Sequence, residues 1–283
     1  TDTVRPCLAA SIARRRSPSG RAGSVRTSVT TVPSVFLYGV VNASPDSLNT
    51  DSIATTPAAA AARARQLLAD GCQGIDLGGQ GSTDVAAEVP WHEEWARLEA
   101  IVPALVGLGV PVSIDTWRPE TARRALEQGV SVINAADGMQ SAEMWEVAVD
   151  FEAPIVVPFL SGPDPRRMSH VGSDPVATIV EFFDARLRDA DRYGLRRRCI
   201  LDPGTGFAPS NWPWEQRYEY QKIVYSNLDE LRVFDLPLYI ALPWKDTAQH
   251  DELLDIVLRG RPEFGRCHYP AKIRRVEREV AEG

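Results

Sequence analysis

The sequence offers little that would mark a membrane protein, a disulfide-stabilised protein or a metal-cluster protein. Its apolar stretches fall well short of the roughly 18 residues that a membrane-spanning helix needs. The four cysteines, Cys7, Cys72, Cys199 and Cys267, form neither a CxxC pair nor a metal-ligand spacing. This favours free, buried thiols and a reducing cytoplasm. With 44% hydrophobic and 24% charged residues among 283, the composition is that of an ordinary globular protein.

Acidic residues are scarce in one region, residues 1–33. Six arginines against Asp2 give this segment a charge of +5, and the total of −7 then leaves −12 for the rest. Because the segment has no sustained amphipathic period, it is predicted to be a disordered basic tail. A transit peptide and an over-long start-site assignment are two other interpretations. The acidic remainder, residues 34–283, is a poor match for a nucleic-acid partner.

Eight short apolar runs, each ending in polar or acidic residues, recur along the chain. They lie at 36–42, 74–79, 112–117, 131–138, 154–160, 199–204, 236–245 and 264–270. Stretches of helical pattern separate them, so the order of elements favours βα units and a parallel sheet. Eight units in about 250 residues is the size of a closed (β/α)8 barrel, or TIM barrel. A single such domain over residues 34–283 is predicted.

The ends of these runs carry the side chains best suited to chemistry. They are Asn42, Asp76, Asp115, Asn134, Asp202, Lys245, Arg266 and His268. Barrels of this type place their active sites at the carboxyl ends of the strands. We therefore expect these distant residues to surround one mouth.

The helices between the runs are expected at 57–70, 91–109, 118–129, 141–151, 174–194, 212–234, 249–260 and 273–283. Thr56 and Pro57 have the residue types of an N-cap and first helical position. In the sixth helix, Trp214, Tyr218 and Tyr225 are expected on one apolar face. We interpret these rings as core or subunit contacts rather than as a ligand site.

Five motifs along the chain carry a resemblance to a known family. They are GVVNASPDSL (39–48), GIDLGGQGST (74–83), VSIDTWRPETARRALEQG (112–129), VINAADG (132–138) and CILDPGTGF (199–207). In this order, over roughly residues 36–280, they resemble dihydropteroate synthase, the folate-pathway member of the pterin-binding barrels. The resemblance implies a transferase that condenses a dihydropterin-methyl pyrophosphate with p-aminobenzoate and releases pyrophosphate.

The resemblance also implies roles for the residues that match the family. Asp115 and Asn134 face the pterin, Asp202 bonds its amino-pyrimidine edge, and Lys245 contacts its oxo and ring-nitrogen side. Asn42 lies near Mg2+, the implied cofactor and metal contact, and near the pyrophosphate. Arg266 and His268 grip the pyrophosphate, Phe207 lies beside the p-aminobenzoate ring, and Thr83 binds substrate from the loop after the second strand. The catalytic set is Asp115, Asp202, Lys245, Arg266 and His268. A homodimer is the implied assembly.

These residue types suit that chemistry. Carboxylate and carboxamide groups on rigid strand ends can match the fixed donors and acceptors of a pterin edge. Loss of pyrophosphate leaves a pterin-methyl cation, which nearby carboxylates such as Asp115 and Asp202 stabilise. Arg266 offers a planar fork to the leaving oxygens. Since the amine of p-aminobenzoate attacks, the reaction needs no protein nucleophile.

Several polar residues have two interpretations. Asp76 either touches ligand or holds the backbone of the loop after the second strand. Asp46 and Ser47 are either turn-formers or parts of a loop that closes the site. His92, His170 and His250 are expected on the surface or in loops.

The sequence departs from the family at three places. After the second strand, Asp84 stands where the family has an arginine. On the seventh strand, Pro243-Trp244-Lys245 replaces Ser-x-Lys, and the fifth strand ends in Pro158-Phe159 where Met-His is common. All three fall around the second substrate, whereas the pterin set is intact.

These departures keep other hypotheses open. A diverged paralogue would join the pterin to a different nucleophile, and a methyltetrahydrofolate-dependent methyltransferase is a more distant version. Such a methyltransferase would not need Arg266 and His268 to bind pyrophosphate. A non-catalytic pterin-binding protein would bind pterin without turnover.

Overall fold

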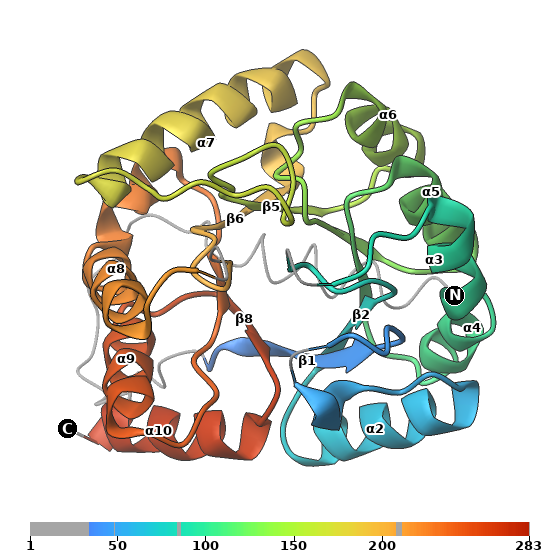
Figure 1. Ribbon diagram of the computed structural model, residues 1–283, viewed down its shortest axis with the longest axis horizontal. Coiled ribbons are helices and arrows are strands. Elements are labelled where there is room, and N and C mark those ends of the chain that lie inside the picture. The colour runs from blue at the N-terminus through green and yellow to red at the C-terminus, as the bar shows by residue number, and fades with distance from the viewer. Residues whose placement is uncertain (1–33, 48, 84–85, 208–210, 283) are drawn as a thin grey trace, which may run out of the picture.

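The computed structural model describes residues 34–47, 49–83, 86–207 and 211–282 (Figure 1). The expected tail at 1–33 and the acidic replacement Asp84 lie outside these residues. None of the helices within them is long and apolar enough to cross a membrane.

Eight parallel strands form a barrel with helices around it, which confirms the predicted fold. The strands are β1 (Phe36–Asn42), β2 (Gly74–Gly78), β3 (Val112–Thr116), β4 (Val132–Ala135), β5 (Ile155–Pro158), β6 (Cys199–Asp202), β7 (Tyr239–Ala241) and β8 (Phe264–Cys267). β1 pairs with both β2 and β8. A single bridge between Leu201 and Leu238 joins β6 to the segment that leads into β7 and closes the ring.

The helices form the outer ring (Figure 1). They are α2 (Pro57–Ala69), α3 (Trp91–Leu98), α4 (Ile101–Val106), α5 (Pro119–Glu127), α6 (Ala142–Phe151), α7 (Pro175–Arg192), α8 (Trp214–Ser226), α9 (Ala248–Arg259) and α10 (Pro270–Glu282). Three short 3-10 helices are η1 (Thr50–Ser52), η2 (Arg196–Arg198) and η3 (Leu228–Phe234). Thr56 caps α2 as expected, because its hydroxyl accepts from the amide of Ala59 at 3.3 Å.

Two helices expected to be continuous are broken. The expected helix 91–109 divides into α3 and α4, because Pro103 has no N–H and its ring excludes the carbonyl of Glu99 from a regular turn. The expected helix 212–234 ends at Ser226, where the Asn227 side chain donates to the carbonyl of Ile223 at 2.8 Å, and continues as η3. Every strand from β2 to β8 is shorter than its expected run; β7, for example, covers only Tyr239–Ala241 of the run 236–245.

The barrel interior holds its own apolar cluster, apart from the larger core between sheet and helices. Its buried members are Tyr38, Val132, Val156, Ile200, Tyr239 and Phe264. Most of them stand early in their strands, so their side chains fill the amino-terminal half of the barrel. The cluster therefore forms a floor beneath the carboxyl ends of the strands, where the polar residues lie.

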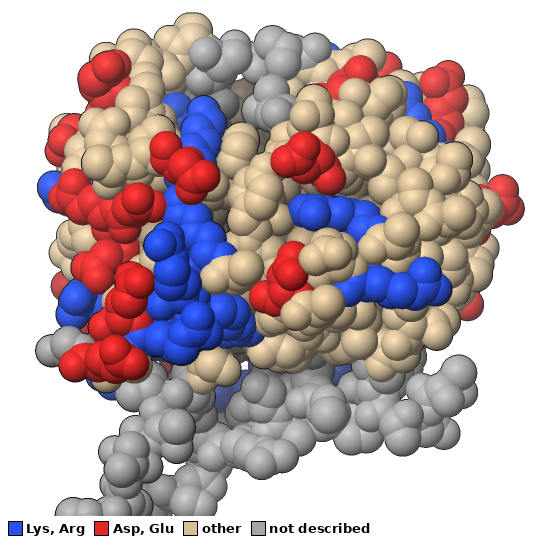
Figure 2. Space-filling view, turned by 90° about the horizontal axis from the view of Figure 1, so that it is seen from below, with Lys and Arg blue, Asp and Glu red and all other residues tan. Residues whose placement is uncertain are grey.

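The three described cysteines, Cys72, Cys199 and Cys267, are free and buried, as expected. Cys72 Sγ and Cys267 Sγ are 3.7 Å apart. On the outside, arginines are interleaved with acids; Arg259, for example, lies 2.9 Å from Asp255. Figure 2 shows such mixed charge on the face seen from below, with bands of basic side chains bordered by acidic ones. Paired arginines are thus the rule on this surface.

Candidate functional site

The carboxyl ends of the strands surround a cavity of about 400 Å³, a size typical of small-molecule sites. All nine residues expected to bind substrate line it: Asn42, Thr83, Asp115, Asn134, Asp202, Phe207, Lys245, Arg266 and His268. The barrel therefore brings together side chains that are up to 226 positions apart in the sequence. Asp46 and Ser47 line it too, which places their loop at the site.

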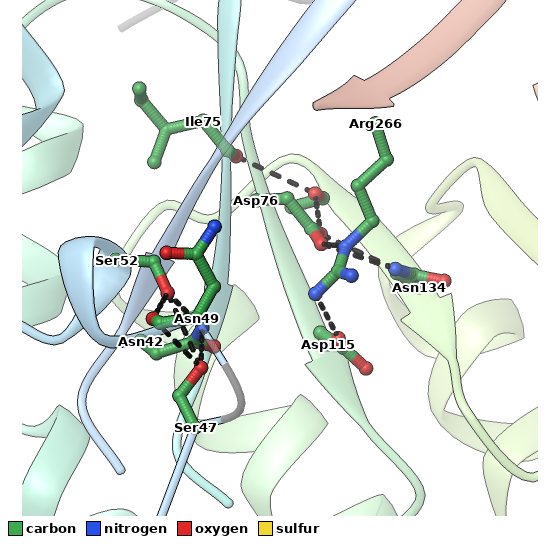
Figure 3. A network of polar contacts seen from close by, with 10 residues as sticks. Asn42, Ser47, Asn49, Ser52, Ile75, Asp76, Asp115, Asn134 and Arg266 are labelled. Atoms are coloured by element: carbon green, nitrogen blue, oxygen red, sulfur yellow. Dashed lines mark hydrogen bonds and ion pairs between the residues drawn. The ribbon is translucent and has the colours of Figure 1, made fainter. Parts of the chain in front are cut away.

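Arg266 on β8 is held by two carboxylates (Figure 3). Its Nε donates to Asp76 Oδ2 at 2.5 Å and its Nη2 to Asp115 Oδ2 at 2.8 Å. Asp76 is fully buried and also accepts from the Ser113 hydroxyl and, at 3.4 Å, from Asn134 Nδ2. Asp76 is not among the cavity-lining residues, and its carboxylate holds Arg266, a role that neither interpretation of Asp76 included.

Burial shifts the ionisation of the acids at this site. It raises the pKa of Asp115 above its usual range, although Arg266 opposes the shift. Burial also raises the pKa of Asp202 to about 7, against the opposing hydrogen bond from the Gly204 amide at 2.8 Å. The carboxyl group of Asp202 therefore changes charge close to neutral pH, where an unburied aspartate is fully ionised.

His268 presents a neutral ring to the cavity. Burial, followed by the nearby charges of Arg266 and Arg63, lowers the pKa of His268 to about 3. Its Nδ1 atom is buried and finds no hydrogen-bond partner in the described part of the chain. The ring of Trp244 meets the imidazole edge-on with centroids 5.6 Å apart. At neutral pH, His268 can therefore offer a hydrogen bond but not a charge.

The carboxamide of Asn42 is oriented by the loop that follows β1 (Figure 3). Its Nδ2 donates to Ser47 Oγ at 2.9 Å and to Ser52 Oγ at 2.8 Å. Both hydroxyls give their own protons to the carbonyl of Asn49, at 3.3 and 2.6 Å, so they act as acceptors for Asn42. Asn42 Oδ1 therefore remains an acceptor for a cation or a donor group.

A second wall of the cavity comes from α8 and α9, and sequence reasoning missed it. Trp214, Arg217, Gln221 and Tyr225 line the cavity from α8, and His250 lines it from α9. The spacing of 214, 217, 221 and 225 marks one face of a helix and could have identified this wall.

One expectation about these residues was wrong and another was confirmed. His250 is buried rather than on the surface, because its ring stacks on Trp214 with centroids 4.4 Å apart and planes at 3°. The expected core contact of Trp214 and Tyr225 is confirmed, since Tyr225 belongs to the buried core and Trp214 packs against it; both rings also line the cavity. Tyr218 points elsewhere and donates to Glu252 at 2.5 Å. His92 and His170 are exposed, as expected.

Only some of the departures from the family lie at the cavity. Pro243 and Trp244 line the cavity, and Lys245 Nζ lies 5.6 Å from the centroid of the Trp244 ring. Phe159 instead packs edge-on against Phe182, with centroids 5.3 Å apart, and neither it nor Pro158 lines the cavity. The change at β5 therefore does not alter the cavity wall.

Residues 38–251 match the family described as pterin binding enzyme. The chain belongs to this family. The chain is 36% identical over 216 residues to dihydropteroate synthase type-2 of Escherichia coli, an alignment that covers 75% of this chain and 78% of that one.

Solved structures agree with this assignment. A dihydropteroate synthase from Thermus thermophilus in complex with 4-aminobenzoate is 27% identical, with a TM-score of 0.71, over 89% of this chain and 93% of that one. The same enzyme in complex with 6HMPPP is 26% identical, with a TM-score of 0.68, over 88% and 93%. The resemblance seen in the motifs is thus confirmed at the level of family and fold.

Proposed function

We propose that this chain is a dihydropteroate synthase, a transferase of folate biosynthesis that joins dihydropterin-methyl pyrophosphate to p-aminobenzoate. The observation that carries the proposal is one cavity lined by both halves of the required site. Asp115, Asn134 and Asp202 offer polar groups suited to a pterin edge, and Arg266 offers a cationic fork suited to a pyrophosphate. The relatives, which are dihydropteroate synthases, support the same activity.

The pterin is proposed to lie against the strand ends of β3, β4 and β6. Asp202 accepts from its amino-pyrimidine edge, while Asn134 can both donate and accept. Lys245 contacts its oxo side from β7. Because these groups stand on packed strands, they can reject analogues that leave one hydrogen bond unmade.

The leaving pyrophosphate is proposed to bind Arg266 and His268. Asp76 fixes Nε of Arg266 from below at 2.5 Å, so the guanidinium edge is held toward the cavity. As pyrophosphate departs, positive charge develops on the pterin methylene, and the carboxylates of Asp115 and Asp202 stabilise it. The amine of p-aminobenzoate then attacks this carbon beside Phe207 and loses a proton.

The residues present fit a magnesium ion held mainly by substrate. Within the described residues, no group of three or more His, Cys, Asp or Glu side chains is placed to hold a metal ion. Magnesium commonly keeps waters and binds through few protein groups plus phosphates. Asn42 Oδ1, freed by the hydroxyls of Ser47 and Ser52, is the proposed protein ligand. Bound there, the ion would neutralise charge on the pyrophosphate.

A homodimer and a cytoplasmic location remain predictions. The proposed subunit contact runs through late elements of the barrel, where Val233 on η3 is 73% exposed and Ile223 on α8 is 42% exposed. Light scattering of the purified chain tests it: a monomeric mass across micromolar concentrations contradicts the dimer.

The activity is tested by pyrophosphate release from dihydropterin-methyl pyrophosphate with Mg2+, with and without p-aminobenzoate. Release that depends on p-aminobenzoate is expected. No release despite pterin binding would point to the paralogue with another nucleophile or to a pterin-binding protein without catalysis. Methyl transfer from methyltetrahydrofolate under the same conditions would instead support the methyltransferase.

A further inference from the structure

Arg217 is a cavity-lining arginine that the proposed reaction does not yet use. It stands in the first turn of α8, is half-buried, and lines the same cavity as the pterin-facing residues. Its Nε atom is buried and has no hydrogen-bond partner within the described ranges. Nearby Lys272, by contrast, is paired with Asp251 at 2.7 Å and Asp246 at 3.1 Å.

The surroundings of Arg217 leave its charge uncompensated. Burial lowers the pKa of Arg217, and the opposing effect comes from the phenol of Tyr225 rather than from a carboxylate. A buried charge is costly unless it is paired. An anion that enters the cavity would supply the missing partner, and a guanidinium pairs best with a planar carboxylate through two parallel hydrogen bonds.

Other residues of this wall reinforce its positive character. Burial and then the charges of Lys245, Lys272 and Arg217 lower the pKa of His250 to about 4, so these cations act on the same spot. The His250 ring is fixed by the stacked Trp214 and by a 2.8 Å contact between its Nδ1 and Thr247 Oγ1. The wall therefore combines cations with flat aromatic surface.

We propose that Arg217 determines specificity for the second substrate by binding an anionic substituent, a carboxylate, on the aryl amine. Lys245 and His250 supply the positive surroundings, and the rings of Phe207 and Trp214 flank the aromatic body. This inference rests on the proposed function, since the second substrate is taken to be an aryl amine. Pro243 also lines the cavity and has no side-chain hydroxyl with which to bind such a carboxylate.

Calorimetry tests the proposal by comparing 4-aminobenzoate with its methyl ester, which keeps the ring and amine but has no charge. Binding is measured with saturating Mg2+, pyrophosphate and the dihydropterin alcohol. The wild-type chain should bind the acid about 30-fold more tightly than the ester, as expected for a charge-assisted pair. The Arg217→Ala and Arg217→Gln variants should lose this preference, and Arg217→Lys should keep part of it.

The matched control is Arg259→Ala, which removes an exposed arginine of α9 and should keep the preference. A wild-type chain without preference, or an Arg217→Gln variant that retains it, would overturn the inference and leave Arg217 as a side chain that reaches into solvent. Pyrophosphate release is measured in parallel. Preference for the acid without release would refute the synthase and leave the carboxylate site standing.

Discussion

Two arginines line one cavity and differ in how their charge is balanced. Arg266 on β8 lies between Asp76 and Asp115, at 2.5 and 2.8 Å. Arg217 on α8 has no such partner in the described structure, and its Nε is buried without a hydrogen bond. The first arginine is integrated into the barrel, whereas the second reaches into ligand space from the helical ring.

The difference separates two kinds of binding residue. Arg266 is preorganised, because its neighbours hold it in place before any ligand arrives. An incoming pyrophosphate must share it with Asp115. Arg217 has no ion pair that an incoming anion would have to displace. An anion that binds there therefore forms a new ion pair without weakening an existing one. Substrate identity is thus expected to be set more by α8 than by β8.

Stability should show the largest contrast. Arg266→Ala leaves Asp76 buried without its cation and is expected to lower the free energy of unfolding by about 3–5 kcal/mol. Arg217→Ala leaves no partner unpaired and should change it by less than about 0.5 kcal/mol. Urea unfolding at pH 7.5 measures both, and equal losses would break the comparison.

Ligand selectivity should separate the two arginines next. Arg266→Ala is expected to weaken binding of dihydropterin-methyl pyrophosphate by about 100-fold, since a bidentate charged contact is lost, and the free pterin alcohol far less. Arg217→Ala should affect neither ligand by more than about twofold. Calorimetry with both ligands checks this, and equal weakening of ester and alcohol would remove Arg266 from the pyrophosphate site.

A pH series should sharpen the contrast further. The pKa of Asp202 is raised to about 7, so its carboxylate form predominates only above that value. If pterin binding needs the carboxylate, raising the pH from 6 to 8 should tighten binding of the pterin alcohol about tenfold. The pKa of His250, about 4, predicts no such change at the α8 wall over this range.

The Asp202→Asn variant is the control for this series. It should bind the alcohol more weakly at pH 8, because an amide donor replaces an acceptor, and lose most of the pH dependence. A variant that keeps the full wild-type slope would assign the titration to another group, with Asp115 the next candidate.

The smallest effect is expected at His268. Because its pKa is about 3, the ring is neutral and contributes one uncharged hydrogen bond. His268→Gln should therefore weaken binding of the pyrophosphate ester by about fivefold at pH 7.5. A loss of affinity as large as that of Arg266→Ala would mean that the bound anion raises the pKa of His268 and the imidazole becomes protonated.

The apolar runs predicted the strands and the barrel, and the polar residues at strand ends together with the family motifs predicted nine of the residues that line the cavity. The sequence could not reveal the role of Asp76, whose partner Arg266 is 190 positions away. The break between α3 and α4 and the wall from α8 were also missed. The spacing of the wall residues shows a shared helix face, but an aromatic helix face packs equally well against a core or a ligand, so its role was missed.

The seam of the barrel has a consequence for its motion. β8 is hydrogen-bonded on both sides, to β1 and β7, whereas one bridge between Leu201 and Leu238 joins β6 to the segment before β7. Within the sheet, we expect amide protons to exchange with deuterium fastest at this seam. Phe207 follows β6 on one side of this seam, and Lys245 follows β7 on the other. Local opening of the seam would therefore widen the entrance for the aryl amine. Arg266 would stay in place while the larger product departs.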